Sequence, residues 1–206
     1  MITKFNPIYK LGFLSSELPR NLFLKLKAET QRMIDTEFRD CIPYGENLVG
    51  AIRHEYRLEN HTTELLQFIN TILPSYFANW PADFPGNPPV VGFNNEEKAI
   101  WVNFQQKNEY NPLHLHHGDW SFVAWVNIPY DIKTEDRHTK LGTRFYFHHT
   151  DILDGGIRSF PIKVDENSEG KIIIFPAKLH HSVTPFFTSN GYRVSISGNL
   201  VAINNG

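Results

Sequence analysis

Apolar residues in the first half of the chain recur every three to four positions, which is the spacing of an amphipathic helix. The first segment with this spacing runs from Leu18 to Phe38 and predicts a helix. Ser15 or Ser16 precedes it in a position to cap its first turn, and Pro19 suits an early helical position. We therefore expect the chain to open with a helix that buries one face.

A second helix is predicted over residues 62–73, where apolar residues again share one helical face. Pro74 should end or kink this helix, because proline lacks the backbone N–H that continues it. Between the two helices, Leu48 to Leu58 is expected to form a strand. Residues 79–92 contain several prolines and glycines and predict a loop that joins the helical part to the rest of the chain.

From Lys98 onward the pattern changes to short runs of β-branched and aromatic residues that are separated by turn residues. The strands predicted from these runs are Ala99–Gln105, Leu113–His116, Trp120–Ile128, Thr143–His148, Lys171–Phe175, His181–Phe187 and Tyr192–Val201. Two helices followed by many short strands are typical of an α+β fold with a jelly-roll core, in which the helices pack on one sheet.

Within this fold we expect residues 1–92 to form an N-terminal helical annex with edge strands, and residues 93–206 to form the jelly-roll core, as one domain overall. A barrel of this kind has a mouth wide enough for one small ligand.

The amino-acid composition excludes some classes of binding partner. The net charge is −2, and the basic residues are scattered, so neither nucleic acid nor an anionic membrane is expected as a partner. Cys41 is the only cysteine, the first residues lack the apolar stretch of a signal peptide, and no apolar run is long enough for a membrane span. A cytoplasmic protein is expected; the composition says nothing of its oligomeric state.

The densest chemical signal is a cluster of histidines, at His114, His116 and His117, followed closely by Asp119. Imidazole and carboxylate ligands together suit a divalent first-row metal, and two histidines with one carboxylate leave open positions on Fe(II). Alternate residues of a strand share a face, so His114 and His116 point the same way. If His117 and Gly118 form a two-residue hairpin turn, Asp119 lies opposite His116 on that face.

Other interpretations of the cluster remain open. His117 and Asp119 can form a His-x-Asp pair across the turn, or the metal ligands can be histidines alone. The cluster can also be an exposed turn that binds no metal.

A more distant segment supplies the other half of the predicted site. Only one residue of the pair His180 and His181 can point inward. Farther along, Arg193 and Ser195 share one strand face, and an arginine with a neighbouring hydroxyl suits a carboxylate ligand. An ordinary solvated strand face is the alternative interpretation of this row.

Together these residues resemble the 2-oxoglutarate- and Fe(II)-dependent oxygenase superfamily. The similarity is to small phage and bacterial hydroxylases of the prolyl-hydroxylase type, and it covers about the last half of the chain. It is carried by the stretch from Pro112 to Val123, and by Phe175-Pro, the His181-Ser-Val run and Arg193-Val-Ser-Ile-Ser-Gly-Asn199. The superfamily normally shows His-x-Asp or His-x-Glu, whereas this chain shows a histidine at position 116.

The resemblance implies a dioxygenase that hydroxylates a C–H bond of a peptide or small molecule and releases succinate and carbon dioxide. Its cofactors would be Fe(II), 2-oxoglutarate and dioxygen, with no catalytic residue beyond the metal centre. It implies that His181, rather than His180, is the distal metal ligand. With the strand geometry above, this predicts His114, His116, Asp119 and His181 as the metal ligands, and the resemblance itself does not decide among His114, His116, His117 and Asp119. Arg193 would bind the distal carboxylate of 2-oxoglutarate, and Ser195 would assist.

Neighbouring strands offer further residues for the pocket. Asn103 and Tyr110 are expected to contribute to cofactor binding, with a place in the core as the alternative. Trp101 and Trp125 are also candidates for the pocket, but the core is favoured for them. Two alternatives to the oxygenase function remain: a cupin-like metal enzyme that does not use 2-oxoglutarate, and a non-enzymatic jelly-roll protein with a binding or structural role.

Overall fold

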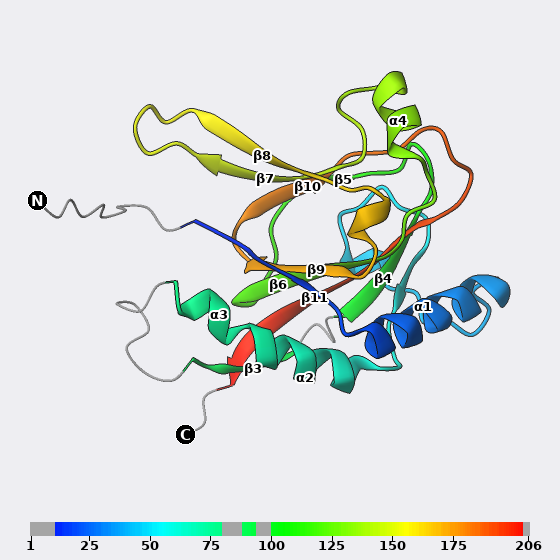
Figure 1. The fold of residues 1–206 in the computed structure, drawn as a ribbon, viewed down its shortest axis with the longest axis horizontal. Helices are drawn as coiled ribbons and strands as arrows, with labels where there is room; N and C mark the ends of the chain where they lie inside the picture. Colours follow the sequence, from blue (N-terminus) through cyan, green and yellow to red (C-terminus); the bar gives the residue numbers. More distant parts are fainter. Residues whose placement is uncertain (1–10, 80–87, 94–99, 204–206) are drawn as a thin grey trace, which may run out of the picture.

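Two antiparallel β-sheets face each other, and helices cover the outer side of the larger one (Figure 1). The computed structural model describes residues 11–79, 88–93 and 100–203. The predicted α+β fold with a jelly-roll core is confirmed. The proline-rich loop predicted over residues 79–92 lies largely outside the described residues, and the division of the chain at residue 92 stays a prediction.

The larger sheet has seven strands among the described residues, in the order β1-β9-β6-β11-β4-β2, with β3 paired to β11. Its strands are β1 (Leu14–Glu17), β2 (Glu55–Arg57), β3 (Val90–Phe93), β4 (Ile100–Gln105), β6 (Trp120–Asn127), β9 (Lys171–Pro176) and β11 (Arg193–Ile203). The N-terminal part of the chain therefore contributes three strands to the same sheet as the predicted core.

The smaller sheet has four strands in the part of the chain that the structure describes, in the order β5-β10-β7-β8. They are β5 (Asn111–His114), β7 (Arg144–Thr150), β8 (Ile157–Lys163) and β10 (His180–Val183). The β7–β8 hairpin extends beyond the body of the fold (Figure 1). A short helix, α4 (Ile132–His138), connects β6 to β7 and is capped by the carboxylate of Asp131, which accepts from the Thr134 N–H.

Three helices pack on the outer face of the larger sheet: α1 (Arg20–Asp35), α2 (Thr62–Ile72) and the short α3 (Pro74–Phe77) (Figure 1). The two long helices confirm the prediction from helical spacing, and Pro74 ends α2 by starting α3. Short 3₁₀ turns occupy Gly45–Asn47 and Glu166–Ser168.

Strand alternation divides the interior into two apolar clusters. Ile172, Ile174 and Ile196 join the helices in one cluster, on the outer face of the larger sheet. Ile173 and Phe175 point the other way and pack with Phe147 of the smaller sheet. The run of apolar residues in β9 is thus explained, because both faces of this strand are covered.

Three local predictions are wrong. Ser15 and Ser16 do not cap α1; they lie in β1 and pair with β9, and no side chain caps this helix. The strand expected from Leu48 to Leu58 shrinks to β2. The hairpin through His117 and Gly118 does not form, because β5 pairs with β10 of the smaller sheet, whereas the following strand β6 belongs to the larger sheet.

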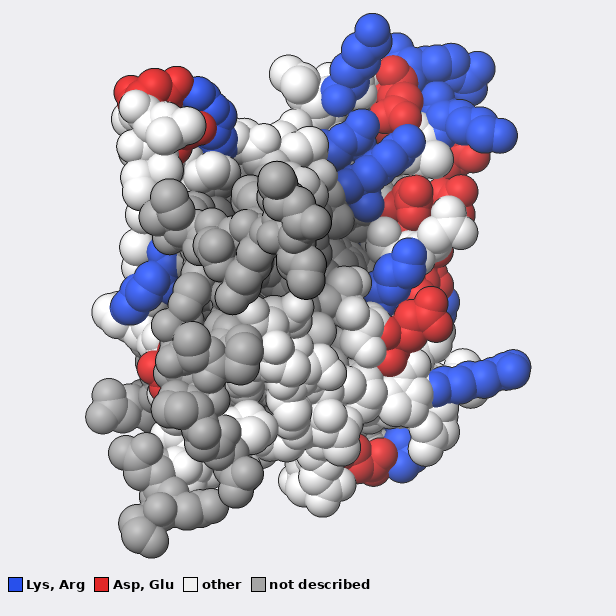
Figure 2. Space-filling model, turned by 60° about the vertical axis from the view of Figure 1, so that its left-hand side comes forward, with Lys and Arg blue, Asp and Glu red and all other residues white. Residues whose placement is uncertain are grey.

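No described helix has the length and apolar character that would be needed to cross a membrane. On the face shown in Figure 2, Lys and Arg side chains gather along one edge and lie beside Asp and Glu side chains.

Candidate metal centre

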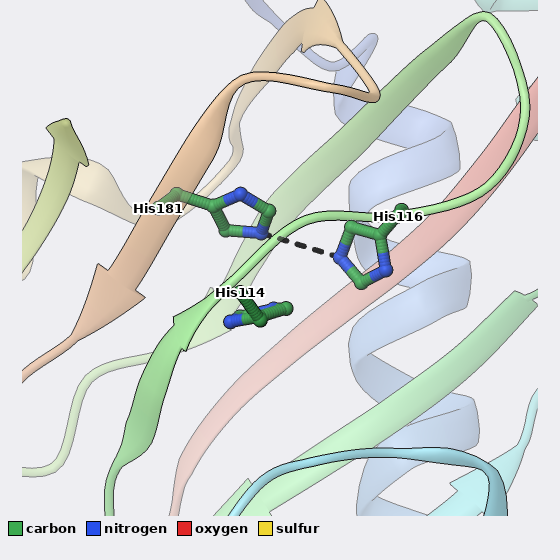
Figure 3. A group of neighbouring side chains, drawn as sticks. All are labelled: His114, His116 and His181. Carbon is green, nitrogen blue, oxygen red and sulfur yellow. Dashed lines mark hydrogen bonds between the residues drawn. The ribbon is translucent and has the colours of Figure 1, made fainter. Parts of the chain in front are cut away.

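Three histidines from two distant segments of the chain converge between the sheets. His114 ends β5 and pairs directly with His181 of β10, and His116 follows in the segment after β5. Figure 3 shows the three rings pointing toward a common centre. One nitrogen from each ring lies within 4.8 Å of the others, a spacing that suits coordination of one metal ion.

Backbone carbonyls orient two of these rings. The Nδ1 of His114 lies 2.7 Å from the carbonyl oxygen of Pro112, and the Nδ1 of His181 lies 2.9 Å from that of Leu179. A carbonyl only accepts, so each Nδ1 carries the proton and each Nε2 presents a lone pair. The Nε2 atoms of His181 and His116 are 3.2 Å apart (Figure 3).

Burial keeps the three imidazoles neutral. Desolvation lowers the pKa of His114, lowers that of His116 to about 3 and holds that of His181 well below its usual range. Repulsion among the neighbouring imidazoles lowers the pKa values of His116 and His181 further. A metal ligand must be unprotonated, so these histidines are ready to bind a divalent cation at neutral pH.

Aromatic side chains pack around the cluster and restrict the rings. The rings of Phe145 and His181 stack with centroids 5.4 Å apart, and Phe175 lies 4.9 Å from His181 on an edge. Trp101 lies 5.6 Å from His116. These aromatic rings reduce the contact of the imidazoles with water, which explains the direction of their pKa shifts.

The structure does not bring Asp119 into the cluster. Its side chain is exposed, and one carboxylate oxygen accepts from the Ala202 N–H at 2.8 Å. His117 is exposed at the edge of the cavity and is absent from the group of convergent ligand atoms, as is His180. Ser121, two residues after Asp119, donates from its hydroxyl to Asn199 Oδ1 in the buried sheet.

The histidines line a cavity of about 650 Å³ on the inner face of the larger sheet. Arg193, Ser195 and Asn103 line it, as their strand faces predict, and so do Trp101 and Trp125. Tyr110 does not: its ring is exposed and its backbone pairs with Ala51.

Arg193 is a buried cation held by neutral groups. Its Nε and Nη2 donate to Gln105 Oε1 at 3.1 and 2.6 Å, Nη2 also donates to the Thr184 carbonyl, and Nη1 donates to Tyr130 Oη. Within the described residues, no carboxylate forms an ion pair with it. A buried guanidinium without a counter-ion favours an anionic ligand.

Gln105 and Glu55 are among the polar residues of this cavity that sequence reasoning missed. Gln105 ends a predicted strand and shares a face with Trp101 and Asn103, so alternation was a sufficient signal for it. Glu55 lies in a segment with no clear alternation, and nothing in the sequence singles it out.

Residues 99–199 match the family model described as "Putative 2OG-Fe(II) oxygenase". A prolyl-4-hydroxylase from Pseudomonas putida is similar in structure, with a TM-score of 0.57, 16% sequence identity and 94% of each chain covered. AviO1 from Streptomyces viridochromogenes Tue57 gives a TM-score of 0.53 at 13% identity, covering 95% of this chain and 91% of that one. At these identities the likeness shows the fold. No protein of curated function matches the chain significantly in sequence.

Proposed function

We propose that this chain, whose residues 99–199 match the model of a 2OG-Fe(II) oxygenase family, is an oxygenase of that family that hydroxylates a C–H bond of a small molecule or peptide. Fe(II), 2-oxoglutarate and dioxygen are the cofactors of this family. The observation that supports the proposal most strongly is that three neutral imidazoles line the same cavity as Arg193, a buried arginine with no ion-pair partner among the described residues.

His114, His116 and His181 would hold the iron. Imidazole suits Fe(II), and three ligands on one side leave positions for 2-oxoglutarate and dioxygen. When bound, the iron supplies the oxidising chemistry, with succinate and carbon dioxide as co-products. The chain itself fixes the tautomers of His114 and His181 through Pro112 and Leu179, so that their lone pairs are in place before the metal arrives.

Arg193 would bind the distal carboxylate of 2-oxoglutarate. Gln105, Tyr130 and the Thr184 carbonyl hold the guanidinium in position, and Ser195 is two residues along the same strand face. Because the guanidinium is already ordered and desolvated, a carboxylate gains a charge-assisted hydrogen bond there at little further entropic cost.

Succinate release tests this function. Wild-type protein, supplied with Fe(II), ascorbate and 2-oxoglutarate, is expected to form succinate, and His181→Ala and Arg193→Gln should each abolish most of it. His180→Ala is the matched control, because it removes the exposed neighbour of His181 and should leave turnover unchanged. Turnover that depends on His181 but not on Arg193 would favour a metal enzyme that does not use 2-oxoglutarate. Turnover that survives His181→Ala would contradict the proposal.

A further inference from the structure

Glu55 is a buried carboxylate with an unsatisfied oxygen. The residue is 4% exposed and lines the cavity, and its Oε1 has no hydrogen-bond partner among the described residues. No described cation pairs with it, although Arg57 lies two positions along on the same strand face. A buried acceptor without a donor is costly, so its retention here requires an explanation.

A second unsatisfied acceptor lies beside the first. Glu55 pairs directly with Asn103 of β4, which pairs in turn with Ser195 of β11, so the three side chains form one row across the floor of the cavity. The Asn103 Nδ2 lies 3.4 Å from Ser195 Oγ, whereas its Oδ1 has no partner among the described residues. A ligand with several N–H groups could donate a hydrogen bond to each of these two oxygens.

Two glycines before β2 let the backbone pass close to this carboxylate. A Cβ built at Gly45 would lie 3.3 Å from Glu55 Oε2, and one built at Gly50 would lie 3.0 Å from Oε1 and would collide with Asn111 Oδ1. Glycine at position 50 therefore permits the close approach of the backbone to these polar groups.

An aromatic wall connects this carboxylate with the histidines. The rings of Tyr44 and Trp101 stack with centroids 5.6 Å apart, and Trp101 also lies 5.6 Å from His116. Electron-rich ring faces attract cations and tolerate the carbon chain that carries them. A ligand that places a cation at Glu55 would therefore extend along Trp101 toward the candidate metal centre.

We propose that Glu55, with Asn103 beside it, determines substrate specificity by binding a protonated amine of the substrate. This proposal rests on the proposed function, in that it assigns the substrate of the same cavity. Binding of the ammonium group satisfies both orphaned oxygens and neutralises the buried carboxylate. With the amine held at Glu55, the carbon chain of the substrate extends past Trp101, and a C–H bond some distance from the amine faces the metal.

Electrostatics agree with a cationic ligand. Burial, with a smaller contribution from the like charge of Glu109, raises the pKa of Glu55 to about 8. Without a bound cation the carboxyl group therefore holds a proton at neutral pH, and the cationic Arg57 and Arg193 that also line the cavity form no ion pair with it in the described structure. A bound ammonium group would lower this pKa and stabilise the ionised carboxylate.

Binding of matched probes tests the proposal without turnover. Ligand-observed NMR would compare n-pentylammonium with the neutral 1-pentanol, using protein loaded with Zn(II) and 2-oxoglutarate and, separately, protein without either. A second arm compares an acetylated and amidated Ala-Lys-Ala peptide with its norleucine analogue, and it distinguishes a free amine from a lysine side chain. We expect wild-type protein to bind at least one cationic probe about tenfold or more tightly than its neutral partner.

The variants assign this preference to one side chain. Glu55→Gln should remove the preference, Glu55→Asp should keep part of it, and Glu46→Gln, which neutralises an exposed carboxylate in the nearby turn, should leave it unchanged. The proposal is overturned if wild-type protein shows no preference in either arm, or if the preference survives in folded Glu55→Gln. Failure of wild-type protein to bind metal would instead overturn the proposed function. The preference for the cationic probe, measured on protein without metal, would still test the role of Glu55.

Discussion

His114 and His181 lie directly opposite each other across the β5–β10 ladder, and each places its Nδ1 against the carbonyl oxygen of the residue two positions earlier. The two strands thus repeat one local arrangement, which presents both Nε2 lone pairs to the same space. His116 completes the group from the segment after β5. The backbone of the smaller sheet therefore sets the ligand geometry before any metal binds.

Replacing Arg193 by glutamine is expected to weaken 2-oxoglutarate binding about 30-fold or more, because a charge-assisted contact in a desolvated site contributes roughly 2 kcal/mol or more. Isothermal titration calorimetry with 2-oxoglutarate on metal-loaded protein measures this. Arg158→Gln, which removes an exposed arginine of the β7–β8 hairpin, is the control and should bind as wild type does. Equal affinity in Arg193→Gln and wild type would exclude Arg193 from the carboxylate site.

Gln105 is a positioning residue, because two of the hydrogen bonds that hold the Arg193 guanidinium end on its amide oxygen. We expect Gln105→Leu to weaken 2-oxoglutarate binding roughly tenfold while the affinity for metal stays unchanged, since the histidines do not contact Gln105. Parallel titrations with metal and with 2-oxoglutarate separate these effects. An equal loss of both affinities would indicate that the substitution disturbs the fold.

Asp119 provides a test of the ligand set. Its carboxylate caps the Ala202 N–H, so Asp119→Ala should lower the free energy of unfolding by about 1 kcal/mol and leave the metal affinity unchanged. Chemical denaturation and metal titration on the same preparation check both parts. If Asp119→Ala lost as much metal affinity as His181→Ala does, Asp119 would be a metal ligand after all.

The raised pKa of Glu55 makes a prediction about stability and pH. Between its ordinary pKa of 4.5 and its folded value of about 8, the folded state holds a proton that the unfolded state has lost. The free energy of unfolding contributed by this group therefore falls as pH rises, by at most about 1.4 kcal/mol per pH unit.

Glu55→Gln lacks this titration, so its stability relative to wild type should increase from pH 5 to pH 8 and level off above. Urea denaturation of both proteins across that range measures the difference. A difference that is constant with pH would show that the carboxyl group is not shifted.

Local patterns in the sequence predict much of the fold. Helical spacing located α1 and α2. Alternation in β11 correctly placed Arg193 and Ser195 on one face, which lines the cavity, whereas Val194 and Ile196 lie under the helices. These features depend only on which face of an element is buried. The short strands β1, β3 and β8 were not predicted, since four to seven residues with mixed polarity carry little periodic signal.

The candidate site could be predicted only in part, because its geometry depends on how distant strands pair. The sequence places His116 and Asp119 three residues apart, and a tight hairpin would have joined them. In the structure the chain crosses between sheets at this point, which pairs His114 with His181 and sends Asp119 to the end of β11. Register between distant strands is a tertiary property, so no local pattern could distinguish these outcomes.

Titration of the protein with Mn(II), a redox-stable substitute for Fe(II), tests the central claim most directly. Wild-type protein and His180→Ala should each bind one equivalent with the same affinity, and His181→Ala should bind at least about 100-fold more weakly, because it removes one of three ligands. Binding by His181→Ala that equals wild type would contradict the account, since the convergent histidines would then not hold the metal.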